Sequence, residues 1–73
     1  MIQGFIKRID KEQVEIETPD HNRIWIEARR IASSYNLGDV LVEDVRTGQF
    51  HVDFAATQVH LKQVRLLSDK TFD

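Results

Sequence analysis

Residues 13–29 read QVEIETPDHNRIWIEAR, and this stretch decides the fold. Branched apolar residues alternate with polar ones both before and after the central TPDHN. This period of two is typical of strands that have one buried face and one solvated face. Pro, Asp and Asn in the central segment favour a tight turn. The stretch therefore predicts two antiparallel strands, at 13–17 and 23–29, that are joined by that turn.

Three more strands are predicted around this hairpin. Segment 4–9 (GFIKRI) precedes it, segment 40–45 follows Leu-Gly-Asp, and the connection RTGQ leads to a short strand at 50–52. Residues 30–36 show no alternation and predict an irregular or 3₁₀-like turn. Five short strands at this spacing predict a mainly β fold, a small five-stranded antiparallel barrel or bent sheet that is SH3-like or OB-like.

One C-terminal helix is predicted at about 54–69. Asp53 precedes it and can accept hydrogen bonds from the free N–H groups of the first turn. Apolar residues fall on two sides of this helix, so we expect one side to pack on the sheet and the other to contact something else. The sheet-packing side comprises Ala55, Ala56, Val59, Leu66 and Leu67, and the second side comprises Phe54, Leu61 and Val64.

The composition limits the possible functions. A chain of 73 residues predicts a single domain over 1–73, and its 41% hydrophobic and 30% charged residues are typical of a globular protein. The absence of cysteine excludes disulfides and thiolate metal sites. No apolar run is long enough to span a membrane or to form a signal region, so we expect a soluble, cytoplasmic protein.

Catalytic and metal-binding motifs are weak or missing. The three glycines lie at a strand start and in two turns, and the sequence contains no phosphate loop or nucleophile motif. His51 and Asp53 have the spacing of two metal ligands on a strand, with His60 as a third candidate, but no further ligand completes the set. We therefore expect a helix-capping role for Asp53, no catalytic residue, no metal and no cofactor.

Protein binding is the function that the sequence favours. A second apolar side on the helix of so small a protein indicates an interface. Trp25 is out of phase with the buried isoleucines and can anchor a partner, although cover of its ring by the terminal helix is slightly favoured. We predict a non-catalytic binding module for a protein partner or for a second copy of the chain. Its candidate contact residues are Phe54, Leu61, Val64 and Trp25.

Nucleic-acid binding is the alternative prediction. Small barrels present strand faces and loops to DNA or RNA, and Trp25 can stack on a base. However, the first 36 residues hold six basic and six acidic residues, whereas dedicated nucleic-acid binders show a basic excess. The competing interpretation of these charges is cross-strand ion pairing. The basic candidates are Lys7, Arg8, Arg23, Arg29 and Arg30.

The order of short motifs along the chain resembles a known family. The motifs are FIKRID, VEIE, IWIEARRI, LGDVL and FHVD, the last of which opens a helix that contains a threonine. They resemble the small bacterial domain-of-unknown-function family 3006, in which a Gly-Asp-Val-Leu-like strand entry and an Asp-x-x-x-Thr helix start recur. Those features match residues 38–41 and Asp53 with Thr57. The resemblance implies a bacterial protein with a β-rich start, and it implies no established chemistry.

Overall fold

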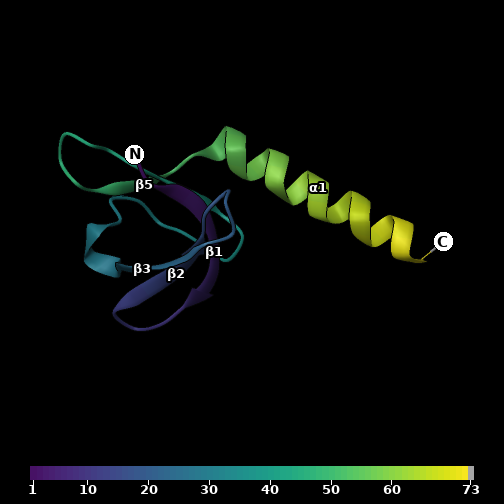
Figure 1. Ribbon diagram of the computed structural model, residues 1–73, viewed down its shortest axis with the longest axis horizontal. Helices are drawn as coiled ribbons and strands as arrows, with labels where there is room; N and C mark the ends of the chain where they lie inside the picture. The colour runs from purple at the N-terminus through teal and green to yellow at the C-terminus, as the bar shows by residue number, and fades with distance from the viewer. Residues whose placement is uncertain (73) are drawn as a thin grey trace.

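The structure is a computed structural model that describes the backbone of residues 1–72 and the side chains of residues 1–63 (Figure 1). Five strands form one antiparallel sheet in the order β3-β2-β1-β4-β5, and a single helix follows. The elements are β1 (Gln3–Ile9), β2 (Gln13–Glu17), β3 (Arg23–Glu27), the 3₁₀ helix η1 (Ala28–Arg30), β4 (Val40–Glu43), β5 (Phe50–Val52) and α1 (Phe54–Phe72).

This architecture confirms the prediction of a mainly β fold with five antiparallel strands and one C-terminal helix. The sheet is bent and is not closed by a continuous ladder. An irregular register between Ile6 and Arg8 bends β1, as β-bulges do. The fourth strand returns beside the first, which is the Greek-key order that OB-folds also use. One parallel bridge, between Ile31 and Phe50, lies beside β5.

Two predicted strands end earlier than the sequence indicated. The strand expected at 23–29 stops at Glu27, because the chain turns into η1 before the irregular segment predicted at 30–36. The strand expected at 40–45 stops at Glu43, because the next residue begins the β4–β5 hairpin. The main-chain N–H of Gly48 donates to the carbonyl oxygen of Asp44 at 2.8 Å, and this glycine has a φ of 74°. The predicted glycine of the hairpin therefore supplies a backbone conformation that other residues rarely adopt.

The hydrophobic core receives at least one side chain from every strand. The alternation that predicted β2 and β3 places Val14, Ile16 and Ile26 inside, whereas Ile24 is only partly buried. Because successive side chains of a strand point to opposite faces, the charged residues of β2 and β3 lie on the other face of the sheet. The buried core consists of Ile6, Val14, Ile16, Ile26, Leu41, Phe50 and Val52.

Gly4 is buried where β1 passes closest to the end of β2. A methyl group on its Cα would lie 2.4 Å from the carbonyl oxygen of Glu17, which is closer than van der Waals contact permits. The position therefore admits only glycine without movement of the backbone. This close approach holds β1 against the last residue of β2.

The start of α1 is fixed to β4 through the backbone of Val40. The hydroxyl oxygen of Thr57 accepts a hydrogen bond from the Val40 N–H at 2.8 Å, and the Asp53 N–H donates to the Val40 carbonyl at 2.8 Å. The carboxylate of Asp53 accepts from the N–H of Ala56 at 3.0 Å, which confirms its predicted capping role. Thr57 is only 5% exposed, so its hydroxyl group acts as an internal anchor.

Beyond its first turns α1 points away from the sheet, and the molecule measures 45 × 23 × 23 Å (Figure 1). Val59 is 57% exposed and Ala55 is exposed, so the prediction that these two residues pack on the sheet was wrong, whereas Ala56 of the same predicted side is partly buried. Contact with the sheet is made instead through Thr57 and His60. Leu66 and Leu67 lie outside the residues whose side chains are described. Within the described chain no helix has the length and apolar character needed to cross a membrane.

Replacement of Thr57 by valine tests the anchor of α1. Thr57→Val keeps the side-chain volume but leaves the Val40 N–H without its acceptor, so we expect a loss of about 1 to 3 kcal/mol in the free energy of unfolding. Urea denaturation followed by circular dichroism measures this loss. Thr57→Ser, which keeps the oxygen, is the matched control and should lose less. Equal midpoints for wild type and Thr57→Val would contradict the anchoring role.

Candidate functional site

The two predicted partner-binding residues of α1 whose side chains are described are exposed. Phe54 is 74% exposed and Leu61 is 47% exposed. They are seven residues apart, which is two helical turns, so they lie on one side of the helix; we call this pair the helix patch. Leu61 also borders the loop before β4, since its Cδ2 would lie 3.2 Å from a methyl group placed on Gly38. Val64 lies outside the residues whose side chains are described.

Val59 extends the exposed apolar surface to another side of α1. It is two residues from Leu61, which places the two side chains about 160° apart around the helix axis. The sequence assigned Val59 to the sheet-packing side, whereas the structure leaves it 57% exposed. The described part of α1 therefore offers large apolar side chains on two nearly opposite sides.

Trp25 lies on a different surface from the helix patch. It is on β3, an edge strand of the sheet, whereas α1 packs on β4. Its register partner on β2 is Glu15, and the indole is 42% exposed. Trp25 therefore remains available to solvent, contrary to the slightly favoured expectation that the terminal helix covers its ring. The structure does not bring Trp25 together with Phe54 and Leu61.

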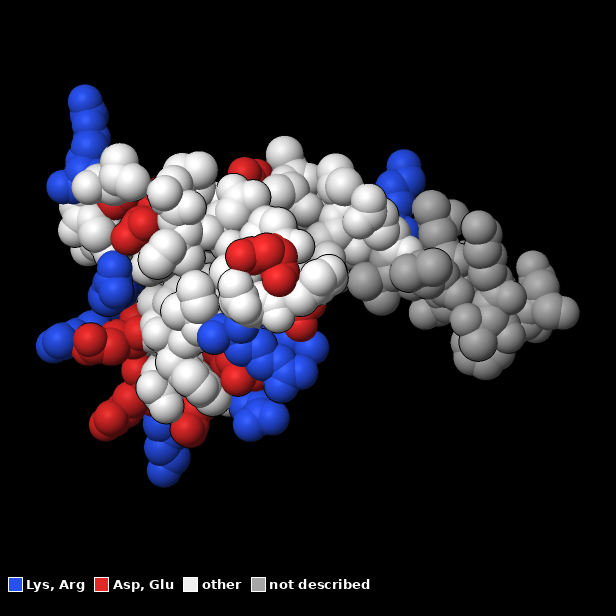
Figure 2. Space-filling model, in the orientation of Figure 1, with Lys and Arg blue, Asp and Glu red and all other residues white. Residues whose placement is uncertain are grey.

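The predicted basic residues each lie near a carboxylate. Three of them form ion pairs, with N–O distances between 2.7 and 3.6 Å, and the other two are placed opposite glutamates in the strand register. Figure 2 shows blue and red side chains intermixed over the strands. The ion pairs are Lys7–Glu17, Arg29–Glu27 and Arg30–Glu43, and the register neighbours are Arg8–Glu15 and Arg23–Glu17.

Arg30 has a structural role in addition to its ion pair. Its guanidinium donates two hydrogen bonds to the carbonyl oxygen of Gly48, at 2.8 and 3.0 Å. The same group lies 5.1 Å from the centre of the Phe50 ring, within cation–π range. These contacts tie η1 to the β4–β5 hairpin, so Arg30 is committed to the fold rather than free to contact phosphate.

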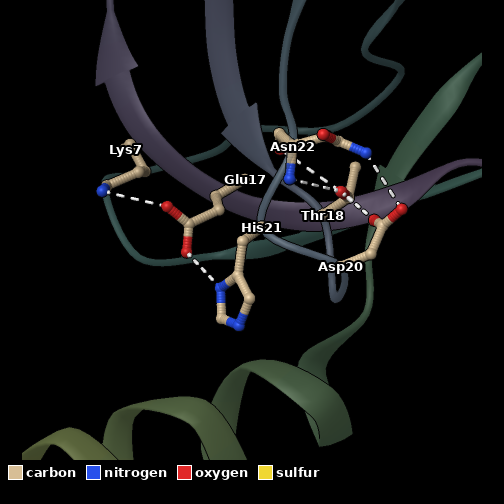
Figure 3. A network of polar contacts seen from close by, with 6 residues as sticks. All are labelled: Lys7, Glu17, Thr18, Asp20, His21 and Asn22. Carbon is tan, nitrogen blue, oxygen red and sulfur yellow. Dashed lines mark hydrogen bonds and ion pairs between the residues drawn. The ribbon is translucent and has the colours of Figure 1, made fainter.

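A polar network occupies the β2–β3 loop (Figure 3). The Lys7 ammonium donates to the Glu17 carboxylate at 3.1 Å, and His21 Nδ1 lies 3.6 Å from the other carboxylate oxygen. The hydrogen bond from Lys7 lowers the pKa of Glu17 below its ordinary value, and proximity to His21 adds to the effect. Thr18 and Asn22 close the loop, and the Thr18 hydroxyl lowers the pKa of Asp20. The predicted turn is confirmed, with a left-handed φ of 66° at His21.

A small apolar depression lies between this loop and the first turns of α1. Its volume is about 240 Å³, and Gly4, Phe5, Val40 and Ala56 line it together with the loop. Beside it the ring of Phe5 stacks on that of His60, with 4.2 Å between centroids. Ligand pockets usually hold about 300 Å³ or more, so the depression alone does not define a small-molecule site. Sequence reasoning missed this pairing, because no local pattern links β1 with a helix so distant in the chain.

Two of the three candidate metal ligands are engaged in other contacts, and the third is exposed. Asp53 caps α1, His60 stacks on Phe5, and His51 is exposed on β5. Among residues 1–63 no group of three metal-ligating side chains is found.

Comparison of the chain with models of known protein families, with curated proteins and with solved structures gives no match. The resemblance to family 3006 therefore stays a prediction. The functional proposal rests instead on the surface of α1.

The pKa of Glu17 provides a test of the loop network. We expect its carboxyl group to titrate below an ordinary glutamate in a pH titration followed by NMR, and Lys7→Met to raise the midpoint, because the ammonium no longer stabilises the carboxylate. A carboxyl group whose pKa is lowered by folding stabilises the protein above its unfolded pKa. That stabilisation is lost as the pH falls through the folded pKa. Arg8→Met is the control, since Arg8 faces Glu15. The same Glu17 midpoint in wild type and Lys7→Met would refute the assignment.

Proposed function

We propose that the chain is a non-catalytic binding module that recognises a protein through α1. The observation that carries the proposal is that α1 leaves the sheet after its first turns while the large apolar side chains of its described part, Phe54, Val59 and Leu61, stay exposed. Helices in proteins owe most of their stability to tertiary packing, and an isolated helix of this length is marginal in water. A partner that covered the exposed sides of α1 would supply the missing packing.

The exposed side chains are suited to anchoring such a partner. Full burial of a Phe, Leu or Val side chain contributes about 1.5 to 3 kcal/mol relative to full exposure. Phe54 is more exposed than Val59 and Leu61. It directly follows the Asp53 cap, so its backbone is already ordered and loses little conformational freedom on binding. Aromatic anchors of this kind often dominate binding energy.

Trp25 is a second, separate candidate contact. Because β3 and α1 lie on different parts of the fold, one small contact surface does not span both. We therefore propose the helix patch as the primary interface and Trp25 as a site for a larger partner that reaches the sheet.

The nucleic-acid alternative has less support. Ion pairs and facing glutamates offset the positive charges that would contact phosphate, and Arg30 is committed to the β4–β5 hairpin. Binding that depends on phosphate contacts would appear at low salt and fall steeply as salt rises. The residues of this alternative are Lys7, Arg8, Arg23, Trp25, Arg29 and Arg30.

Site-specific photo-crosslinking in living cells tests the proposed function. With p-benzoylphenylalanine in place of Phe54, we expect a discrete covalent adduct after irradiation, because the ring would lie inside the interface. The same residue in place of the exposed Gln49, on the β4–β5 hairpin, is the matched control and should give no adduct. Adduct mass is read by gel electrophoresis and mass spectrometry.

Two results would contradict the proposal. Absence of an adduct at position 54 would remove α1 as the interface, as would equal labelling at positions 54 and 49. A purified chain that binds a random oligonucleotide pool at low salt and releases it at physiological salt would favour the nucleic-acid alternative.

A further inference from the structure

The chain exposes more surface than a compact protein of its mass. A folded monomer of 8.5 kDa is expected to expose about 4,700 Å², whereas this chain exposes 5587 Å². The excess is therefore about 900 Å² per chain. The radius of gyration agrees, since it is 12.9 Å against about 11 Å expected for this length. The projecting α1 in Figure 1 accounts for the elongation.

The described part of α1 has few charges despite its exposure. Lys62 is the one formally charged side chain among residues 54–63, although 30% of all residues in the chain are charged. Figure 2 shows the contrast, with mostly white atoms over the start of the helix and with blue and red atoms over the strands. Depletion of charged residues distinguishes the core of a protein interface from ordinary surface. The composition of this segment thus agrees with the excess area in pointing to burial.

We propose that the partner of α1 is a second copy of this chain, in a two-fold symmetric dimer; this inference rests on the proposed function. The excess of about 900 Å² per chain is close to the roughly 800 Å² that each partner buries in a stable interface of standard size. Two-fold dimers are the commonest soluble assemblies, and their interface is formed by the same patch on both copies. Here that patch contains Phe54 and Leu61.

Pairing of the helices alone buries too little surface. α1 has 19 residues and is about 28 Å long, so a contact strip about 10 Å wide covers roughly 300 Å² per helix. The remaining area requires each helix to touch the strands of the other copy as well. An antiparallel arrangement in which the first turns of the two helices meet achieves this, because it places residues 54–63 of each helix beside the sheet of the other copy.

This arrangement also explains why α1 is apolar on two sides. Val59 and Leu61 point in nearly opposite directions around the helix axis, and both are exposed in the single chain. A helix held in the angle between the partner's helix and the partner's sheet is covered on both of those sides.

Sedimentation velocity of the purified chain at physiological salt tests the dimer. Over a roughly hundredfold concentration range, we expect a species of twice the 8.5 kDa chain mass that dissociates on dilution. Leu61→Asp and Phe54→Asp should each raise the dissociation constant about tenfold or more, because each buries an unpaired charge. Phe54→Asp is expected to fold, because an acidic residue in the first turn interacts favourably with the helix dipole.

Gln49→Asp adds the same charge at an exposed position on the β4–β5 hairpin and is the matched control, which should remain dimeric. Circular dichroism checks that every variant is folded. A wild-type chain that is monomeric at all concentrations would overturn the proposed dimer. A wild-type dimer whose dissociation constant is unchanged in both helix variants would also overturn it. If the wild type is monomeric while the crosslink at position 54 gives an adduct of another mass, the dimer fails and the proposed function stands.

Discussion

The backbone of Val40 sets the direction of the terminal helix. Its N–H and its carbonyl are both bonded to the first turns of α1, through Thr57 and Asp53. With β4 held between β1 and β5, these bonds fix the base of the helix to a rigid strand. The helix then continues away from the sheet, and Phe54 and Leu61 stay exposed because of that direction. The candidate interface is thus a consequence of how the helix begins rather than of a separate binding loop.

The strands could be predicted because their signals are local. A period of two placed Val14, Ile16 and Ile26 on one face, and burial of that face decides the register of β2 against β3. Asp53 was identifiable as a cap because the preference for Asp before a helix arises within one turn. Gly48 was identifiable because its positive φ excludes most other residues. In each case the physical cause lies within a few residues of the feature it produces.

The rest of the structure could not be predicted, because it depends on contacts between distant segments. The sequence placed Val59 on the sheet-packing side, but a helical period shows only which residues share a side and not where the axis points. The Lys7–Glu17 ion pair depends on the register of β1 against β2, and the Phe5–His60 stack joins opposite ends of the chain. The main error of the sequence-based prediction therefore concerned the packing of the terminal helix. The same helix contains the candidate site.

That coincidence has a physical basis. A free helix with two apolar sides is inconsistent with the fold of a single chain, and such local conflicts are expected where a protein binds something else. The strands differ from the helix in this respect. Their basic side chains form ion pairs with carboxylates or face them in the strand register, so their charges are matched within the chain. Charged side chains keep the surface of the sheet end compatible with water, whereas Lys62 alone contributes formal charge over residues 54–63. The two ends of the molecule thus differ in what they lack. The charges of the sheet end are matched within the single chain, whereas the described part of the helix leaves its large apolar side chains exposed.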